Sequence, residues 1–133
     1  MWGISSVTPP LEVPGPIRVG VAALFILSGA CIGIAGVVAF RREKTTINPI
    51  KPQTTSALIT SGIYRLSRNP MYVGMLFALV AWAVFLSSAW AMIGPAAFFL
   101  YINRFQIEPE ERVLAGLFGA TYSDYKSTVR RWL

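Results

Sequence analysis

Two clusters of charged and aromatic residues, separated by a long uncharged stretch, hold the side chains of this 133-residue chain that could do chemistry. The first cluster lies at residues 64–72 and the second at residues 104–112. The candidates in them are Tyr64, Arg65, Arg68, Asn69, Tyr72, Glu108, Glu110, Glu111 and Arg112. Arginine binds anionic groups and a carboxylate binds cationic ones, so carboxylates opposite two arginines favour a bound, charged ligand. Taken singly, each residue could instead anchor a helix at the head groups or compensate a helix dipole.

The absence of histidine from the sequence narrows the chemistry. It excludes His-based catalytic triads and most zinc or iron sites, and no metal is expected. The single cysteine, Cys31, lies within an apolar stretch, where a lone thiol acts as a small apolar filler. The apolar stretches carry one charge, Arg18, at an outer end. Ion pumps and proton relays keep ionisable groups at membrane depth, so a transporter is disfavoured and chemistry is expected at the membrane boundary.

The elements that must position the two clusters are apolar helices. Only 14% of the residues are charged, whereas soluble domains carry roughly 25%. Residues 17–40 hold one charge and residues 71–102 hold none. A span needs about 20 apolar residues, and its backbone must be hydrogen-bonded internally. Because neither stretch alternates with period two, both are predicted to be helices in lipid.

The 32-residue uncharged stretch is predicted to fold as a hairpin. It gives roughly 48 Å of helix against a hydrocarbon core of about 30 Å, too long for one span. The turn is expected at Ser87-Ser88, with Gly94-Pro95 kinking the last span or serving as the alternative turn. Asn69 and Pro70 predict the helix start, as N-cap and first helical residue. Since both ends of a hairpin lie on one side, the two clusters should lie next to each other.

Together these features predict one domain, an all-α integral membrane protein with about three transmembrane helices and short amphipathic helices at the cytoplasmic face. Lys and Arg, which make the net charge +6, gather in residues 41–70 and after residue 102. Basic segments stay cytoplasmic, so the N-terminus is expected outside an inner or plasma membrane. Contacts with anionic lipids are expected and nucleic acid is not. The predicted segments are an irregular lead-in (1–16), a first span (17–40), a cytoplasmic loop (41–69), a second span (70–87), a third span (88–105) and a cytoplasmic tail (106–133).

Two further patterns concern helix packing. Gly29 and Gly33 form a small-residue face on the first span. Such a face predicts close approach of another helix and makes a homodimer a candidate assembly. In the tail, Pro109 is expected to open a short helix and Gly119 to close it. The apolar periodicity of this helix puts Glu110 on its apolar face.

Residues 62–74 read Gly-Ile-Tyr-Arg-Leu-Ser-Arg-Asn-Pro-Met-Tyr-Val-Gly. This run resembles the signature of the isoprenylcysteine carboxyl methyltransferase and phospholipid methyltransferase group, which reads Gly-x-Tyr and then Arg-His-Pro-x-Tyr-x-Gly. The tail is similar as well, with Pro109-Glu110-Glu111 and a basic end at Arg130-Arg131. The resemblance covers about residues 45–133. Asn69 stands where many members have histidine, and longer members carry an additional N-terminal span.

The resemblance implies an integral-membrane methyltransferase that uses S-adenosylmethionine and has no Rossmann domain. It places the cofactor at the cytoplasmic face, between the start of the second span and the paired glutamates. By their matching positions, Arg68 and Glu111 are predicted to be catalytic. The predicted cofactor-binding residues are Tyr64, Arg68, Asn69, Pro70, Tyr72, Gly74, Glu110 and Glu111.

The leading hypothesis is therefore methyl transfer to a lipophilic small molecule or lipidated substrate. A carboxylate of an isoprenylcysteine-like or other isoprenoid acceptor needs no general base, because it is already anionic at neutral pH. Phospholipid N-methylation is the alternative, and an amine would require a base such as Glu111 or water. An NADPH-dependent membrane reductase and a non-enzymatic membrane scaffold remain further alternatives.

Overall fold

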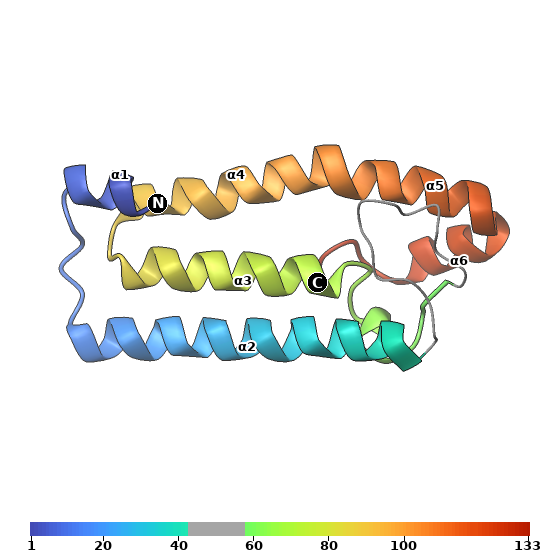
Figure 1. Cartoon of the computed structure of the whole chain (residues 1–133), viewed down its shortest axis with the longest axis horizontal. Coiled ribbons are helices and arrows are strands. Elements are labelled where there is room, and N and C mark those ends of the chain that lie inside the picture. The colour runs from blue at the N-terminus through green and yellow to red at the C-terminus, as the bar shows by residue number, and fades with distance from the viewer. Residues whose placement is uncertain (43–57) are drawn as a thin grey trace.

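The computed structural model of the chain describes residues 1–42 and 58–133, and every regular element in those residues is a helix. Three rows of helix lie side by side along the length of the molecule (Figure 1). The expectation of an all-α protein is confirmed for the described residues. Residues 43–57 of the predicted cytoplasmic loop lie outside them. The elements are α1 (Trp2–Val7), α2 (Gly15–Arg42), a 3-10 turn (Gly62–Arg65), α3 (Pro70–Phe85), a second 3-10 turn (Ala89–Met92), α4 (Ile93–Ile102), a π-helical turn (Asn103–Ile107), α5 (Glu108–Phe118) and α6 (Ala120–Thr128).

Helix α2 is the one helix of the described residues that is long and apolar enough to cross a membrane. At 28 residues it is about 42 Å long, which exceeds a hydrocarbon core of about 30 Å. Its most apolar 18-residue window has a mean hydropathy of 2.5, and 17% of that window is buried. A core helix of a soluble protein would be mostly buried, whereas most of this window is exposed. Large apolar side chains exposed on α2 include Ile17, Val19, Leu24, Leu27 and Ile34.

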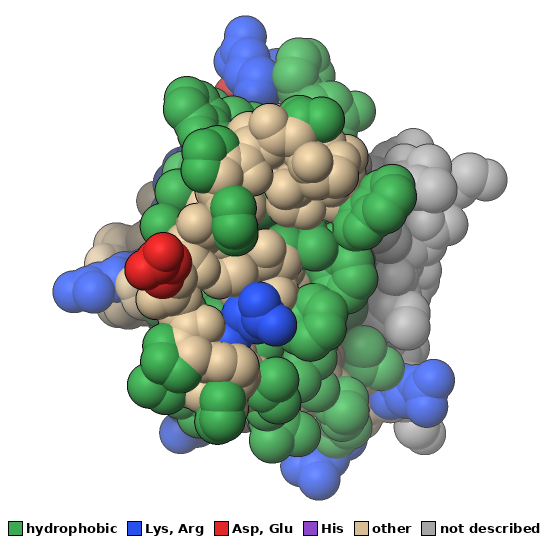
Figure 2. All heavy atoms as spheres, turned by 90° about the vertical axis from the view of Figure 1, so that its left-hand side faces the viewer, with side chains coloured by type: hydrophobic (Ala, Val, Ile, Leu, Met, Phe, Trp, Pro, Cys, Tyr) green, Lys and Arg blue, Asp and Glu red, His purple; other side chains and the backbone are tan. Residues whose placement is uncertain are grey.

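Apolar exposure extends beyond α2. Trp82, Trp90, Phe99 and Leu100 are also exposed, on α3, the turn that follows it and α4. The end of the molecule that carries α1 is covered largely by hydrophobic side chains, with few charged ones among them (Figure 2).

Glycines let α2 and α3 approach closely. A Cβ added to Gly29 would lie 2.8 Å from Phe77 Cβ, and one added to Gly74 would lie 2.7 Å from the Gly29 carbonyl oxygen. The predicted glycine face is therefore used for packing within the chain. The homodimer stays a prediction, but α3 covers Gly29, and no described atom lies within 4 Å of a Cβ added to Gly33.

The hairpin turn lies where it was predicted. Helix α3 ends at Phe85, and Ser87 turns the chain with a φ of 51°. The next helical residues belong to the 3-10 turn and then to α4. Because α4 begins at Ile93, Gly94-Pro95 falls in its first turn, where a missing N–H breaks no helical hydrogen bond. The predicted kink of the last span at this pair stays a prediction.

The expectation of an irregular lead-in is wrong for its first residues, because Trp2–Val7 form α1. This helix lies beside the 3-10 turn that opens α4 (Figure 1). The Thr8 hydroxyl lies 2.9 Å from that of Ser88, and the Ser87 hydroxyl donates to the Leu11 carbonyl at 2.9 Å. The hairpin turn thus supplies tertiary contacts that organise residues 1–16, and these contacts join positions more than 70 apart in the sequence.

At the other end of the molecule, no break separates the predicted third span from the tail. Helix α4 continues through the π turn into α5, and Pro109 follows just inside α5. Proline has no N–H to donate to the carbonyl of Phe105, four residues earlier. The π turn, where the hydrogen-bond spacing of the helix changes, ends two residues before Pro109. Pro109 thus lies in the first turn of α5, as predicted, and the π turn joins α5 to α4. Gly119, at a φ of 53°, ends α5 as predicted and turns the chain into α6.

Candidate functional site

The site begins at the amino end of α3. Asn69 holds the predicted N-cap position and the buried Pro70 is the first helical residue. The Asn69 side chain makes no capping hydrogen bond, and its Nδ2 instead donates to the Arg131 carbonyl at 2.9 Å. The backbone N–H of Arg68 donates to the Arg130 carbonyl at 2.9 Å. The carboxyl-terminal residues therefore pass directly over the helix start.

Arg68 and Glu111 form a buried ion pair between the two clusters. Arg68 Nη1 lies 2.8 Å from Glu111 Oε1, and the two side chains are 9% and 10% exposed. The same Nη1 lies 3.2 Å from the Tyr122 hydroxyl on α6. The structure thus brings the two residues predicted to be catalytic into direct contact, as the hairpin topology required.

Glu111 is faced by three cations of the described chain. Besides Arg68, Arg131 donates to both carboxylate oxygens, with Nε 3.0 Å from Oε1 and Nη2 2.7 Å from Oε2. Lys126 Nζ lies 3.8 Å from Oε2. The hydrogen bonds to Glu111 raise the pKa of Arg131 above its ordinary value. Glu111 is therefore paired with several cations at once, and the charge of Glu108 also acts on Arg131.

One buried donor of Arg68 has no partner among the described residues. Within the described part of the chain, Arg68 Nε is shielded from solvent and makes no hydrogen bond. Leaving a buried donor of a charged group unpaired costs about 1–3 kcal/mol or more. An anionic ligand group would satisfy this atom, so Arg68 fits the carboxylate of an amino acid or of a lipophilic acid.

Glu110 points to α3 rather than to the tail. The Tyr72 hydroxyl and Gln106 Nε2 both donate to Glu110 Oε1 at 2.8 Å. Burial raises the pKa of Glu110, these two hydrogen bonds lower it, and the charge of Glu111 raises it again. The net direction is upward, so Glu110 holds a proton more readily than an exposed glutamate does. The paired glutamates therefore face different partners, although they are neighbours in sequence.

Two predicted binding residues, Tyr64 and Gly74, make packing contacts, and the charge of Glu110 also acts on the Tyr64 hydroxyl. Tyr64 is buried in the apolar cluster between the tail and α2, where its ring packs edge-on against Phe40. Its carbonyl accepts a 2.7 Å hydrogen bond from the Tyr125 hydroxyl, and burial raises the pKa of its own hydroxyl. Gly74 packs against α2 at Gly29, away from the charged pair. Their roles in binding a cofactor stay predictions.

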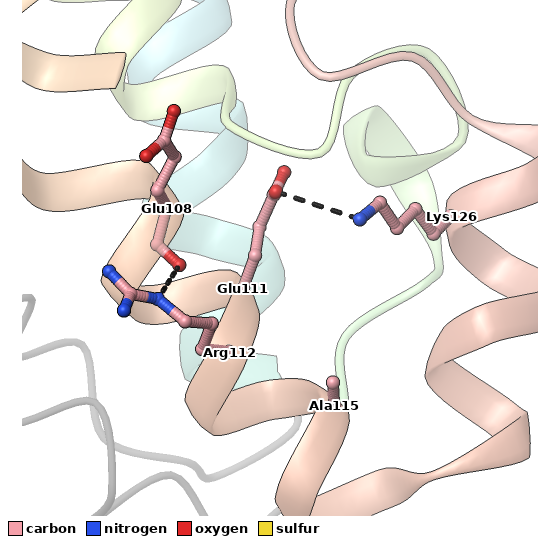
Figure 3. Close-up of a pocket in the computed structure, with 5 residues that line it drawn as sticks. All are labelled: Glu108, Glu111, Arg112, Ala115 and Lys126. Atoms are coloured by element: carbon pink, nitrogen blue, oxygen red, sulfur yellow. Dashed lines mark hydrogen bonds and ion pairs between the residues drawn. The ribbon is translucent and has the colours of Figure 1, made fainter. Parts of the chain in front are cut away.

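An open hollow of about 300 Å³ lies beside Glu111. Glu108, Glu111, Arg112, Ala115 and Lys126 line it, and Glu111 points across it toward Lys126 (Figure 3). Arg112 Nε donates to the Glu108 carbonyl. The hollow therefore adjoins the charged pair and connects it with the surface of α5.

The site also contains four residues that were not predicted from the sequence: Gln106, Tyr122, Lys126 and Arg131. Each contacts Glu110, Glu111 or Arg68 in the structure. A basic end and an aromatic stripe in the tail were visible in the sequence. Nothing in their spacing indicates which side chain turns inward, because the chain reverses at Gly119 and again after α6.

The fold and site define an all-helical protein with a buried arginine–glutamate pair at a helix start. The family model of phospholipid methyltransferases matches residues 17–121. The chain therefore belongs to the phospholipid methyltransferase family, a family of methyltransferase enzymes, and the resemblance seen in the sequence is confirmed.

Related sequences agree with this assignment. An uncharacterized protein of Haemophilus influenzae is 46% identical over 63 residues, which are 47% of this chain and the whole of that protein. Protein-S-isoprenylcysteine O-methyltransferase A of Arabidopsis thaliana is 31% identical over 80% of this chain and 54% of its own length. A probable protein-S-isoprenylcysteine O-methyltransferase of Oryza sativa subsp. indica is 33% identical over 85% of this chain and 59% of its own length. The chain thus spans somewhat more than half of these plant relatives. No solved structure matches it.

Proposed function

We propose that this chain is an integral-membrane methyltransferase that uses S-adenosylmethionine and methylates a carboxylate on a lipophilic acceptor. One observation carries the proposal: the buried Arg68–Glu111 pair, whose Arg68 Nε lacks a described partner, in a chain of a methyltransferase family. The pair lies where two sequence motifs of that family meet.

The residues at the site fit the cofactor's charges. Arg68 offers the cofactor carboxylate a buried donor that is unpaired among the described residues, and Glu110, which faces away from the cations at Glu111, offers an acceptor to its ammonium group. When bound, the cofactor would supply an electrophilic methyl group on a sulfonium centre. The chain's own contribution is to hold Arg68 and the glutamates in fixed relative positions and to exclude water around them, as their low exposure supports.

The three cations that meet at Glu111 support a carboxylate acceptor over an amine. An acceptor carboxylate is anionic at neutral pH, so Lys126 and Arg131 would attract it, whereas they would repel a protonated amine. Amine methylation needs a base, and the Glu111 carboxylate that could serve as one is paired with Arg68, Arg131 and Lys126. The names of the plant relatives point to carboxyl methylation, whereas the family description keeps phospholipid amines as the second candidate.

We further propose three spans near residues 17–40, 70–87 and 88–105, with the site at the cytoplasmic boundary. Four basic residues support this orientation: Arg41 and Arg42 in the last turn of α2, Arg65 in the 3-10 turn before α3, and Arg104 in the π turn. The exposed apolar surface of α2 and α4 would then be solvated by lipid. A lipophilic acceptor could approach the site from the bilayer.

A direct test measures methyl transfer from radiolabelled S-adenosylmethionine by the purified protein in lipid nanodiscs. Two acceptors are compared: a farnesylated cysteine with a free carboxylate, and phosphatidylethanolamine. Transfer to the farnesylated cysteine, and none to its amide, is the expected result. Methylation of phosphatidylethanolamine alone would favour the second candidate, phospholipid N-methylation. If the folded protein did not bind S-adenosylmethionine, both candidate functions would be refuted.

A further inference from the structure

Residues 129–133 follow α6 and run back across the start of α3, and we name them the C-terminal strap. In Figure 1 the strap returns from α6 to the end of α3 nearest the site. Two hydrogen bonds tie its backbone there: the Arg130 carbonyl accepts from the Arg68 N–H and the Arg131 carbonyl accepts from Asn69 Nδ2, both at 2.9 Å. The strap is therefore anchored without the side chain of Arg131.

A second anchor holds the strap at the π turn. Trp132 Nε1 donates to Asn103 Oδ1 at 3.1 Å, and the Trp132 and Phe99 rings lie 4.9 Å apart between centroids. Asn103 is the first residue of the π turn, and Phe99 lies one turn earlier on α4. These contacts fix the course of the strap on both sides of Arg131.

Between these anchors, the Arg131 side chain forms a bidentate ion pair with Glu111. Its two-pronged contact, at 3.0 and 2.7 Å, engages both carboxylate oxygens and so sets the orientation of the carboxylate plane. Arg68 Nη1 shares Oε1 with Arg131. With Nη1 held in this way, Arg68 Nε is left buried and unpaired among the described residues.

We propose that Arg131 is a positioning residue: it orients Glu111, and through Glu111 it presents the free edge of Arg68 to the anionic group of the ligand. The inference rests on the proposed methyltransferase function and adds a residue to it. Arg131 lies outside residues 17–121, to which the family model extends. Because the strap has its own anchors, the effect of Arg131 on Glu111 is separable from the folding of the tail.

The strap supplies its own matched control. Arg130 carries the same charge one position earlier, is exposed, and takes part in the described contacts through its backbone carbonyl. We compare Arg131→Ala, Arg131→Lys and Arg130→Ala in nanodiscs, measuring kcat, the KM for S-adenosylmethionine and the melting temperature. Arg131→Ala should lower kcat/KM about ten- to hundredfold, the scale of one charged hydrogen bond. Arg131→Lys should keep part of the wild-type kcat/KM, since lysine provides a point charge without the planar pair of guanidinium donors. Arg130→Ala should match the wild type.

Chemical rescue separates positioning from a structural role. Free guanidinium ion at sub-denaturing concentration should restore part of the activity of Arg131→Ala, because this variant has a vacant place beside Glu111. It should leave the activity of Arg130→Ala unchanged. Equal activity of the two alanine variants, with an active wild type, would overturn this inference alone. Tighter cofactor binding by Arg131→Ala would also overturn it, since Arg131 would then compete with the cofactor for Glu111. Absence of cofactor binding by the folded wild type would overturn the proposed function and this inference with it.

Discussion

Replacing Arg68 with lysine tests which atoms of this side chain the proposed activity needs. Arginine offers Nη1 to Glu111 and Tyr122 and leaves Nε for a ligand. A lysine ammonium can occupy the place of Nη1, but it has no second donor in the position of Nε. The change therefore keeps the buried charge opposite Glu111 and removes the donor that fits the ligand.

The expected loss follows from these contacts. One charged hydrogen bond is worth about 1.5–3 kcal/mol, and about 1.4 kcal/mol corresponds to a tenfold change. We therefore expect Arg68→Lys to lower kcat/KM by about 10- to 150-fold. The melting temperature should change little, because Glu111 keeps a cation from Arg68→Lys and its two bonds from Arg131.

The assay is transfer of radiolabelled methyl groups to the farnesylated cysteine in nanodiscs, beside a thermal unfolding curve. Arg65→Lys is the matched control, since Arg65 is exposed on the 3-10 turn three residues earlier. It should behave as the wild type. Near-full activity of Arg68→Lys would refute the reasoning, and Arg68 would then be a partner of Glu111 that does not bind ligand.

Three further changes probe packing and protonation. Gly74→Ala would put a Cβ 2.7 Å from the Gly29 carbonyl oxygen and should destabilise the fold by about 1–3 kcal/mol, whereas Gly33→Ala should not. Equal melting temperatures of the two variants would contradict the close approach of α2 and α3. Because the pKa of Glu110 is raised, the folded state binds more protons, so the unfolding free energy should fall as pH rises above the ordinary glutamate value of 4.5. Glu110→Gln should flatten that part of the profile, and an unchanged slope would argue against the partial burial of Glu110. Tyr125→Phe removes the hydroxyl that donates to the Tyr64 carbonyl at 2.7 Å, and it should lower the free energy of unfolding in denaturant by about 1–3 kcal/mol. An unchanged free energy of unfolding would mean that water replaces the hydroxyl.

The apolar helices and the candidate site could be predicted because they depend on local patterns. Lipid-length apolar stretches must pair their own backbone groups, so residues 17–40 and 71–102 predicted helices without any tertiary information. The turn at Ser87 and the helix end at Gly119 were predicted from residue types suited to chain reversal. The proximity of the two clusters that contain Arg68 and Glu111 followed from the hairpin topology.

Other features are set by contacts between residues far apart in the sequence. Helix α1 and the path of residues 1–16 depend on the hairpin turn some 80 positions away. The π turn before Pro109 keeps α4 and α5 in one row of helix, so the predicted boundary between span and tail has no break. No local pattern distinguishes these outcomes from the predicted ones.

What the sequence by itself determined is the helical class, the family and the two clusters that meet, because hydropathy and motif residues are properties of short segments. The tertiary structure alone decided how the charges are shared. It directs Glu110 to Tyr72 and Glu111 to Arg68, and it returns Arg131 to the same carboxylate from 20 residues further on. The physical reason is that a carboxylate takes its partners from whatever cations the packed helices and the C-terminal strap bring within hydrogen-bonding distance.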